Sequence, residues 1–232
     1  MRTFFITATD TDAGKTMVAA ALMKVIPGAH YWKPVQTGDD RDLRTVQQFS
    51  GRSSEFFHPG RTFSQPLSPH RAAELDGQSI NREDLDRAFA EVRDSLLRLD
   101  RTAGPRWPET RKSGGMDQND TAQSVLFVEG AGGILVPLNR AELWPDWLKD
   151  KDLSLILVCR TGLGTINHSL LSVEAIRSRG LKLAGLVFFG PENEDNQRTV
   201  ADFSGCPVIA RVEMGEDNRS VLIHDLDEAL LR

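Results

Sequence analysis

Gly14, Lys15 and Thr16 stand together near the start of the chain, at the end of the segment TDTDAGKT, residues 9–16. Such a triplet can bind a nucleoside triphosphate. Backbone N–H groups of the turn surround a phosphate, the lysine reaches the outer phosphates, and the hydroxyl ligates Mg²⁺. The strict pattern has another glycine where this chain has Thr9, so the segment is a variant phosphate-binding loop. A structural turn is the alternative, but the apolar run before the loop and the helix-forming run after it favour nucleotide binding.

Glu129 follows the apolar run 125–128 and precedes Gly-Ala-Gly-Gly at 130–133. An acid at the carboxyl end of a buried strand, followed by glycines that let a ligand approach the backbone, suits a metal-bound nucleotide. A solvated acid in a glycine turn is the alternative. We favour the site because a phosphate loop needs such a partner. Three further acids precede a short helix and could bind metal or favour the positive helix start: Asp39, Asp40 and Asp42.

Lys33 and Thr37 belong to a second run, residues 30–35, that is predicted as a strand ending in a turn at 36–38. In a doubly wound sheet we expect this strand to lie beside the first one. Its carboxyl end would then open onto the same crevice as the phosphate loop, which makes both side chains candidates for substrate contact. Composition alone would make Lys33 a solvated lysine at a strand end.

The elements that would position these residues alternate between strands and helices. Predicted strands occupy residues 4–6, 30–35, 125–128, 154–159, 181–189 and 207–212, and predicted helices residues 17–23, 43–49, 81–100, 143–148, 165–180 and 225–231. This alternation predicts an α/β fold with a doubly wound, mostly parallel sheet and helices on both faces.

The connections between these elements differ in length. Residues 51–68 are predicted as a long loop that leads into a helix start at Ser68 and Pro69, and residues 190–196 as an acidic turn. We expect a single domain over residues 1–232, with the polar stretch 101–123 as a flexible surface excursion.

Charge and composition restrict the function classes. The chain has 232 residues, 40% of them hydrophobic, and a net charge of −5, which argues against a nucleic-acid partner because such proteins usually carry a clustered basic surplus. Its two cysteines, Cys159 and Cys206, are expected to be buried and reduced. The first strand follows Met1 almost directly, and the apolar runs are too short for a membrane span. We therefore expect a cytoplasmic protein.

Five stretches of the chain together resemble the dethiobiotin synthetase family: residues 9–16, 31–38, 68–70, 128–133 and 164–168. The resemblance implies a fold like that of P-loop NTPases and an enzyme of biotin synthesis. Such an enzyme closes a cyclic urea on diaminopelargonic acid with CO₂, with ATP as co-substrate and with Mg²⁺. A carbamate forms on one amine, its oxygen attacks the γ-phosphate, and the second amine captures the carbamic-phosphoric anhydride. The rival hypothesis is a nucleotide-switched, partner-binding ATPase of the same group. Those proteins commonly carry a second lysine early in the loop, where this chain has Thr and Asp.

The resemblance also implies roles for individual residues. Lys33, Lys15 and Thr11 are implied as catalytic, because Lys33 would neutralise the carbamate and the other two would act at the phosphates. The implied metal ligands are Thr16, Glu129 and Asp42, with Asp39 and Asp40 still open. The implied nucleotide-binding residues are Asp12, Ala13, Gly14, Lys15, Thr16, Met17, Asp42, Glu129, Gly130, Ala131 and Gly132.

The implied substrate-binding residues are Thr37, Gly164, Thr165, Ile166 and Asn167. The last four would bind the distant carboxylate of the substrate across the interface of a homodimer. One departure concerns the nucleobase, because several family members read adenine with an asparagine where this chain has Phe188 or Phe189. Asn193 or Asn196 could substitute, or the base could be read loosely, so the preferred nucleotide stays open.

Overall fold

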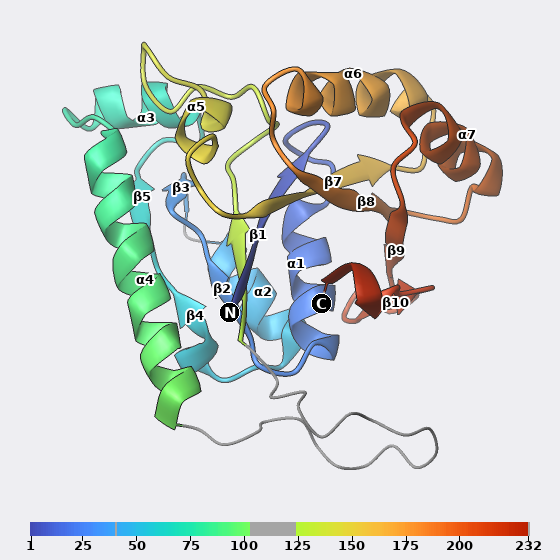
Figure 1. Cartoon of the computed structure of the whole chain (residues 1–232), viewed down its shortest axis with the longest axis horizontal. Coiled ribbons are helices and arrows are strands. Elements are labelled where there is room, and N and C mark those ends of the chain that lie inside the picture. Colours follow the sequence, from blue (N-terminus) through green and yellow to red (C-terminus); the bar gives the residue numbers. More distant parts are fainter. Residues whose placement is uncertain (40, 103–123, 232) are drawn as a thin grey trace.

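The computed structural model describes residues 1–39, 41–102 and 124–231 (Figure 1). Eight strands form one sheet in the order β10-β9-β8-β7-β1-β6-β2-β4, and every described pairing in it is parallel except that of β10 with β9. The strands are β1 (Arg2–Ala8), β2 (Ala29–Trp32), β4 (Phe57–His58), β6 (Val125–Glu129), β7 (Ser154–Arg160), β8 (Leu183–Phe189), β9 (Val208–Met214) and β10 (Val221–His224). The predicted mostly parallel sheet is confirmed.

Helices cover both faces of this sheet, as the sequence predicts. One apolar core lies under α1 (Lys15–Val25) and α2 (Asp42–Ser50). The other lies under α3 (Pro69–Leu75), α4 (Arg82–Thr102), α5 (Trp144–Leu148), α6 (Thr165–Arg177) and α7 (Glu194–Ser204). Neighbouring residues of a strand face opposite sides. Phe4 and Ile6 of β1 therefore join the first core, whereas Phe5 joins the second.

The order of the central strands corrects one expectation. The second strand along the chain does not lie beside the first, because β6 is inserted between β1 and β2. Residues 125–129 are buried throughout, and a strand that is apolar on both faces is stable where it has a neighbour on each side. The carboxyl end of β2 nevertheless opens onto the same edge of the sheet as the loop after β1.

The strand predicted over residues 30–35 is broken in two. β2 ends at Trp32, and β3 (Val35–Thr37) pairs instead with β5 (Arg61–Phe63) in a separate two-stranded sheet. Pro34 lies at the break, and proline has no N–H to donate to a sheet ladder. The backbone at Gly60 packs closely against this break, since a Cβ on Gly60 would lie 2.1 Å from the carbonyl oxygen of Lys33.

Three further expectations are wrong in part. The predicted loop 51–68 contains a 3₁₀ turn, η1 (Ser54–Phe56), together with β4 and β5. The acidic turn 190–196 leads into α7, for which Asn193 is the N-cap, accepting a hydrogen bond from the Asn196 N–H. The closing helix 225–231 is only a 3₁₀ turn, η2 (Glu228–Leu231). Asp225 has a φ of +52°, and the Asp227 N–H donates to the Ile209 carbonyl, which fixes the chain in a non-helical course.

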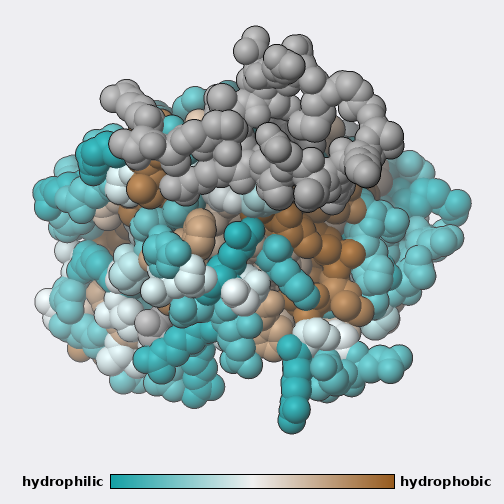
Figure 2. All heavy atoms as spheres, turned by 90° about the horizontal axis from the view of Figure 1, so that it is seen from below, coloured by the Kyte–Doolittle hydropathy of each residue, from teal (hydrophilic) through white to brown (hydrophobic). Residues whose placement is uncertain are grey.

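The burial of both cysteines agrees with the prediction from the sequence. Cys159 and Cys206 are buried free thiols. None of the helices in the described part of the chain combines the length and apolar character that a membrane span requires. Figure 2 views the end of the molecule at which β1 begins and shows an apolar area flanked by polar side chains. Most of the excursion predicted for 101–123, and the candidate ligand Asp40, lie outside the described residues.

Candidate active site

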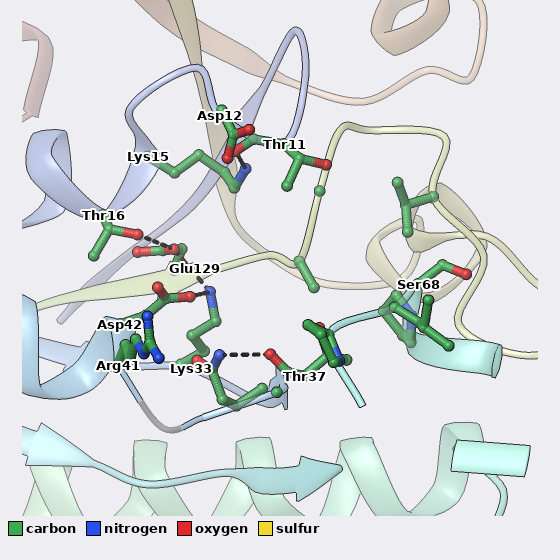
Figure 3. A pocket seen from close by; sticks show the side chains of 18 of the residues that line it. Thr11, Asp12, Lys15, Thr16, Lys33, Thr37, Arg41, Asp42, Ser68 and Glu129 are labelled. Atoms are coloured by element: carbon green, nitrogen blue, oxygen red, sulfur yellow. Dashed lines mark hydrogen bonds and ion pairs between the residues drawn. The ribbon is translucent and has the colours of Figure 1, made fainter. Parts of the chain in front are cut away.

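A cavity of about 1010 Å³ opens at the carboxyl ends of the central strands (Figure 3). Its lining comes from four parts of the chain: the loop between β1 and α1, the connection from β2 to α2, the start of α3 and the glycine turn after β6. In an open parallel sheet, the crevice at this edge is where ligands bind. The fold therefore brings together the segments that the sequence analysis singled out separately.

The loop after β1 prepares the start of α1 for an anion. Gly14 is the N-cap with a φ of +97°, in the left-handed region, and makes no side-chain cap hydrogen bond, so first-turn N–H groups are available to a ligand. The Lys15 ammonium donates to the carbonyl oxygen of Thr11 at 3.1 Å. Burial lowers the pKa of Lys15, although the carboxylate of Glu129 acts in the opposite direction.

Glu129 lies at the centre of the site, at the end of β6 and with no exposed side-chain surface. Its Oε1 accepts hydrogen bonds from the Thr16 hydroxyl at 3.0 Å and from the Lys33 ammonium at 2.8 Å, and its Oε2 accepts one from the Tyr31 hydroxyl at 2.9 Å. These three donors come from α1, β2 and the residue after β2. The position of β6 between β1 and β2 is what lets one carboxylate reach all of them.

Lys33 joins two acids. Its ammonium also lies 2.5 Å from Asp42 Oδ2 at the first residue of α2, and the Lys33 side chain is 5% exposed (Figure 3). Burial alone would lower the pKa of Lys33, but Glu129 and Asp42 outweigh it and raise the pKa above its ordinary value. Asp39, in contrast, is exposed and pairs with Arg41. Of the two candidate aspartates in the described residues, Asp42 is thus the one that pairs with Lys33.

The turn after Glu129 is shaped by close packing. The Gly130 N–H donates to the Ile6 carbonyl, and a Cβ at Gly130 would lie 2.5 Å from the ring of Phe5, so the turn needs a glycine there. The Ala131 carbonyl accepts a hydrogen bond from the Trp144 indole at 3.0 Å. These contacts hold the turn against the sheet, with Ala131 at the cavity wall.

Most of the predicted site residues line this cavity: Thr11, Asp12, Gly14, Lys15, Thr16, Met17, Lys33, Thr37, Asp42, Glu129, Ala131 and Gly132. Ala13 and Gly130 are buried behind it and do not line it. The predicted substrate-binding segment 164–167 does not line it either. That segment begins α6, where Gly164 has a φ of +91° and the Thr165 hydroxyl donates to the Arg160 carbonyl.

The structure adds residues that the sequence analysis did not propose. Gln36 and the start of α3, at Ser68 and Pro69, also line the cavity. Tyr31 contacts Glu129 from within the core. One pattern could have revealed Tyr31: it precedes Lys33 by two residues, so both side chains leave the strand on one face.

A second cavity, of about 720 Å³, lies on the other side of the phosphate loop. Asp12, Arg160, Phe189 and Asn193 are among its lining residues. Phe189 packs against the loop, since a Cβ on Gly14 would lie 2.2 Å from its ring. Phe188 is fully buried in the core and does not line this cavity.

The oxygen ligands of the main cavity suit a hard divalent cation. Thr16 offers a hydroxyl, and Glu129 and Asp42 offer carboxylates, which are the groups that Mg²⁺ prefers. Among the described residues, no group of three His, Cys, Asp or Glu side chains could hold a metal ion by itself. This donor set fits a metal bound jointly by protein, water and phosphate oxygens.

Comparisons with known proteins agree with this geometry. A family model described as an AAA domain matches residues 2–220. An ATP-dependent dethiobiotin synthetase of Christiangramia forsetii is 35% identical over 91% of this chain and 87% of the relative, and one of Novosphingobium aromaticivorans is 38% identical over 96% and 93%. A ParA family ATPase of Chlorobium tepidum has the same fold, with a TM-score of 0.54, 10% identity, and coverage of 99% of this chain and 89% of that one.

Proposed function

Because this chain belongs to the dethiobiotin synthetase family, we propose that it uses ATP and CO₂ to close the cyclic urea of dethiobiotin on diaminopelargonic acid. The observation that carries the proposal is the single cavity in which the phosphate loop, Lys33 and Glu129 meet. Phosphate and carbamate are both anions, and their reaction requires cations held where negative charge accumulates.

Two buried lysines meet this demand for positive charge. Lys15 belongs to the phosphate loop and would bind the outer phosphates in place of the loop carbonyls of Asp10 and Thr11 that it now contacts. Lys33 approaches from the end of β2 and would neutralise the carbamate. The carbamate oxygen then attacks the γ-phosphate and ADP leaves. The second amine attacks the carbonyl carbon of the anhydride, and phosphate leaves as the urea ring closes. Thr11 in the loop would act near the reacting phosphate, and Thr37 would contact the substrate.

Mg²⁺ fits the oxygen ligands of this cavity. We propose Thr16, Glu129 and Asp42 as its protein ligands, supported by the hydrogen bond of Thr16 to Glu129 and by the link of both acids to Lys33. The cation held by these residues would offset the negative charge of the phosphates. Lys33 now neutralises the two carboxylates that would bind the metal, so we expect it to turn toward the substrate when metal and nucleotide bind.

The second cavity is our proposed nucleobase site. It adjoins the phosphate loop at Asp12, and Phe189 forms part of its wall, so the base would contact an aromatic ring. The two asparagines considered as substitutes have structural partners. The Asn193 side chain caps α7, and the Asn196 amide donates to the Thr161 carbonyl at 2.9 Å. Because both side chains already make hydrogen bonds within the protein, we propose that the site discriminates weakly between nucleobases.

We also propose a homodimer in which residues 164–167 bind the distant carboxylate of the partner's substrate. Gly164 and Asn167 are exposed, and the start of α6 lies away from the main cavity of its own subunit. Three large apolar side chains in this region support a covered surface, because Leu163, Leu171 and Leu135 are exposed. The last two border a smaller cavity that α6 forms with the phosphate loop.

The proposal extends to organisation and location. The eight-stranded sheet takes strands from both ends of the described chain, which supports one domain over residues 1–232. We expect the reaction in the cytoplasm, where ATP is available.

Release of ADP from purified protein with Mg²⁺-ATP and bicarbonate tests the function. We expect turnover only when diaminopelargonic acid is added, with dethiobiotin formed in equal amount. The rival, a partner-binding ATPase, predicts hydrolysis that the diamine does not change and a stoichiometric protein partner captured in the presence of ATP. The ParA likeness, at 10% identity, shows the fold alone.

A further inference from the structure

The two oxygens of the Glu129 carboxylate have different surroundings. Oε1 contacts Thr16 and Lys33, both of which line the main cavity. Oε2 contacts the hydroxyl of Tyr31, which is fully buried and does not line that cavity. A carboxylate without solvent requires hydrogen-bond donors to remain charged. Tyr31 therefore satisfies the buried oxygen, and the other oxygen is the one turned toward the cavity.

The sheet register explains how Tyr31 reaches Glu129. Tyr31 of β2 pairs with Phe127 of β6, and Glu129 lies two residues further along β6 on the same face. A tyrosine is long enough to reach a diagonal neighbour across adjacent strands. Its ring packs against Phe57 of β4, with the centroids 6.0 Å apart, and belongs to the apolar core under α1. The pairing of β2 with β6 thus places the hydroxyl beside Glu129, while the contact with Phe57 is made by the ring.

We propose that Tyr31 is a positioning residue for the metal site: its hydroxyl holds Glu129 by Oε2 and so directs Oε1 alone toward the divalent cation. This inference rests on the proposed role of Glu129 as a metal ligand. Mg²⁺ requires nearly ideal octahedral geometry, so the direction of a carboxylate ligand affects affinity. Removing a hydrogen-bond partner behind a metal ligand typically weakens metal binding about 10–100-fold.

Tyr31→Phe tests the proposal, because it removes the hydroxyl and keeps the ring. The readout is Mn²⁺ affinity, measured by electron paramagnetic resonance in the full chain with a non-hydrolysable ATP analogue. We expect the affinity to fall about 10–100-fold and the turnover number to fall at limiting Mg²⁺, with the KM for the diamine unchanged. Phe57→Leu is the matched control, since it removes an aromatic contact of the Tyr31 ring and keeps the hydroxyl that bonds to Glu129; we expect wild-type affinity.

Several results would overturn the proposal. One such result is wild-type Mn²⁺ affinity in Tyr31→Phe together with weakened Mn²⁺ binding in Glu129→Gln. It would refute the positioning role of Tyr31 and leave the proposed metal-binding role of Glu129 in place. An equal loss in Phe57→Leu would assign the effect to packing. If Glu129→Gln binds Mn²⁺ as the wild type does, the metal role of Glu129 fails, and the role of Tyr31 fails with it.

A measurement on the wild-type sequence tests the proposal without any change to Tyr31. Tyr31 is the only tyrosine in the chain, so incorporation of 3-fluorotyrosine gives a single fluorine resonance. We expect this resonance to move when Mg²⁺ is added to the complex with the ATP analogue, and to stay fixed in Glu129→Gln. A fluorine chemical shift that does not change when Mg²⁺ is added to the wild-type complex would contradict the proposal.

Discussion

Replacing Lys33 by glutamine should destabilise the protein most strongly when no divalent cation is present. The Lys33 side chain is 5% exposed and lies between Glu129, which has no exposed surface, and Asp42, which is 31% exposed. Removing one partner of a buried ion pair costs about 3–5 kcal/mol. Because Asp42 is partly solvated, we expect the lower end, about 3 kcal/mol in the free energy of unfolding. For a chain of this size, that corresponds to a fall of about 6–12 °C in the melting temperature.

The pKa of Lys33 fixes the conditions for this measurement. It is raised in the folded protein, so the contribution of the ammonium is fully present below the unfolded value of 10.5 and is lost only as the pH rises through the higher folded value. Melting near pH 7.5 in EDTA therefore measures the full effect. Mg²⁺ with an ATP analogue should restore part of the loss, because the cation neutralises the same two carboxylates.

Lys182→Gln is the matched control for Lys33→Gln. The Lys182 side chain is 74% exposed and lies 3.7 Å from an exposed aspartate, so we expect a change below about 0.5 kcal/mol. Lys33→Gln should also lose most turnover while it still binds nucleotide. The reasoning is refuted if Lys33→Gln and the wild type have the same melting temperature in EDTA. It is also refuted if Mg²⁺ and the ATP analogue raise the melting temperatures of Lys33→Gln and the wild type equally.

Three other predictions concern separate parts of the molecule. Gly14→Ala should lower the free energy of unfolding by about 1–3 kcal/mol and weaken nucleotide binding, because φ is +97° and the new Cβ would lie 2.2 Å from the Phe189 ring. A wild-type melting temperature together with wild-type nucleotide affinity would contradict this. Burial raises the pKa of the Cys159 thiol to about 12, so thiol reagents should label it at pH 8 only after urea unfolding, and labelling of the native protein at the rate of a free thiol would refute the burial. The guanidinium of Arg140, aided by a second arginine, lowers the pKa of Glu74 to about 2. The difference in urea midpoint between Glu74→Gln and the wild type should be full above pH 4.5 and disappear as the pH falls toward 2, and a constant difference would exclude this ion pair.

The sequence predicts the chemistry of the site better than the order of the sheet. Gly14, Lys15 and Glu129 are each marked by a local pattern, because a glycine turn after an apolar run occurs within a few residues. That β6 lies between β1 and β2 depends on pairings such as Arg2 with Val125 and Ala29 with Val125, which join residues far apart in the chain and which no local pattern records. The prediction that the phosphate loop, Lys33 and Glu129 lie at one edge of the sheet was nevertheless correct, because parallel strands all present their carboxyl ends at the same edge.

Short elements were the least predictable. β4 has two residues and β5 has three, too few for an alternating pattern to be visible, and both are held by pairing with partners elsewhere in the chain. The residues around the start of α2 left Asp39 and Asp42 as alternatives, and the resemblance favoured Asp42; the structure separates the two because Asp42 reaches Lys33 whereas Asp39 pairs with Arg41. Cap chemistry could have revealed α7, since Asn193 precedes two acids and Gly205 ends the helix in the left-handed conformation.

The hydrogen bond between Trp144 and Ala131 gives the protein a spectroscopic use. The indole of Trp144 joins the turn that walls the cavity to a cluster containing Phe5, Trp147 and Trp32. Because the Trp144 indole donates to this turn, we expect a charged ligand that binds beside the turn to change the wavelength and intensity of tryptophan fluorescence. Stopped-flow tryptophan fluorescence should then follow ligand binding in real time without an added dye, and Trp144→Phe should remove the change.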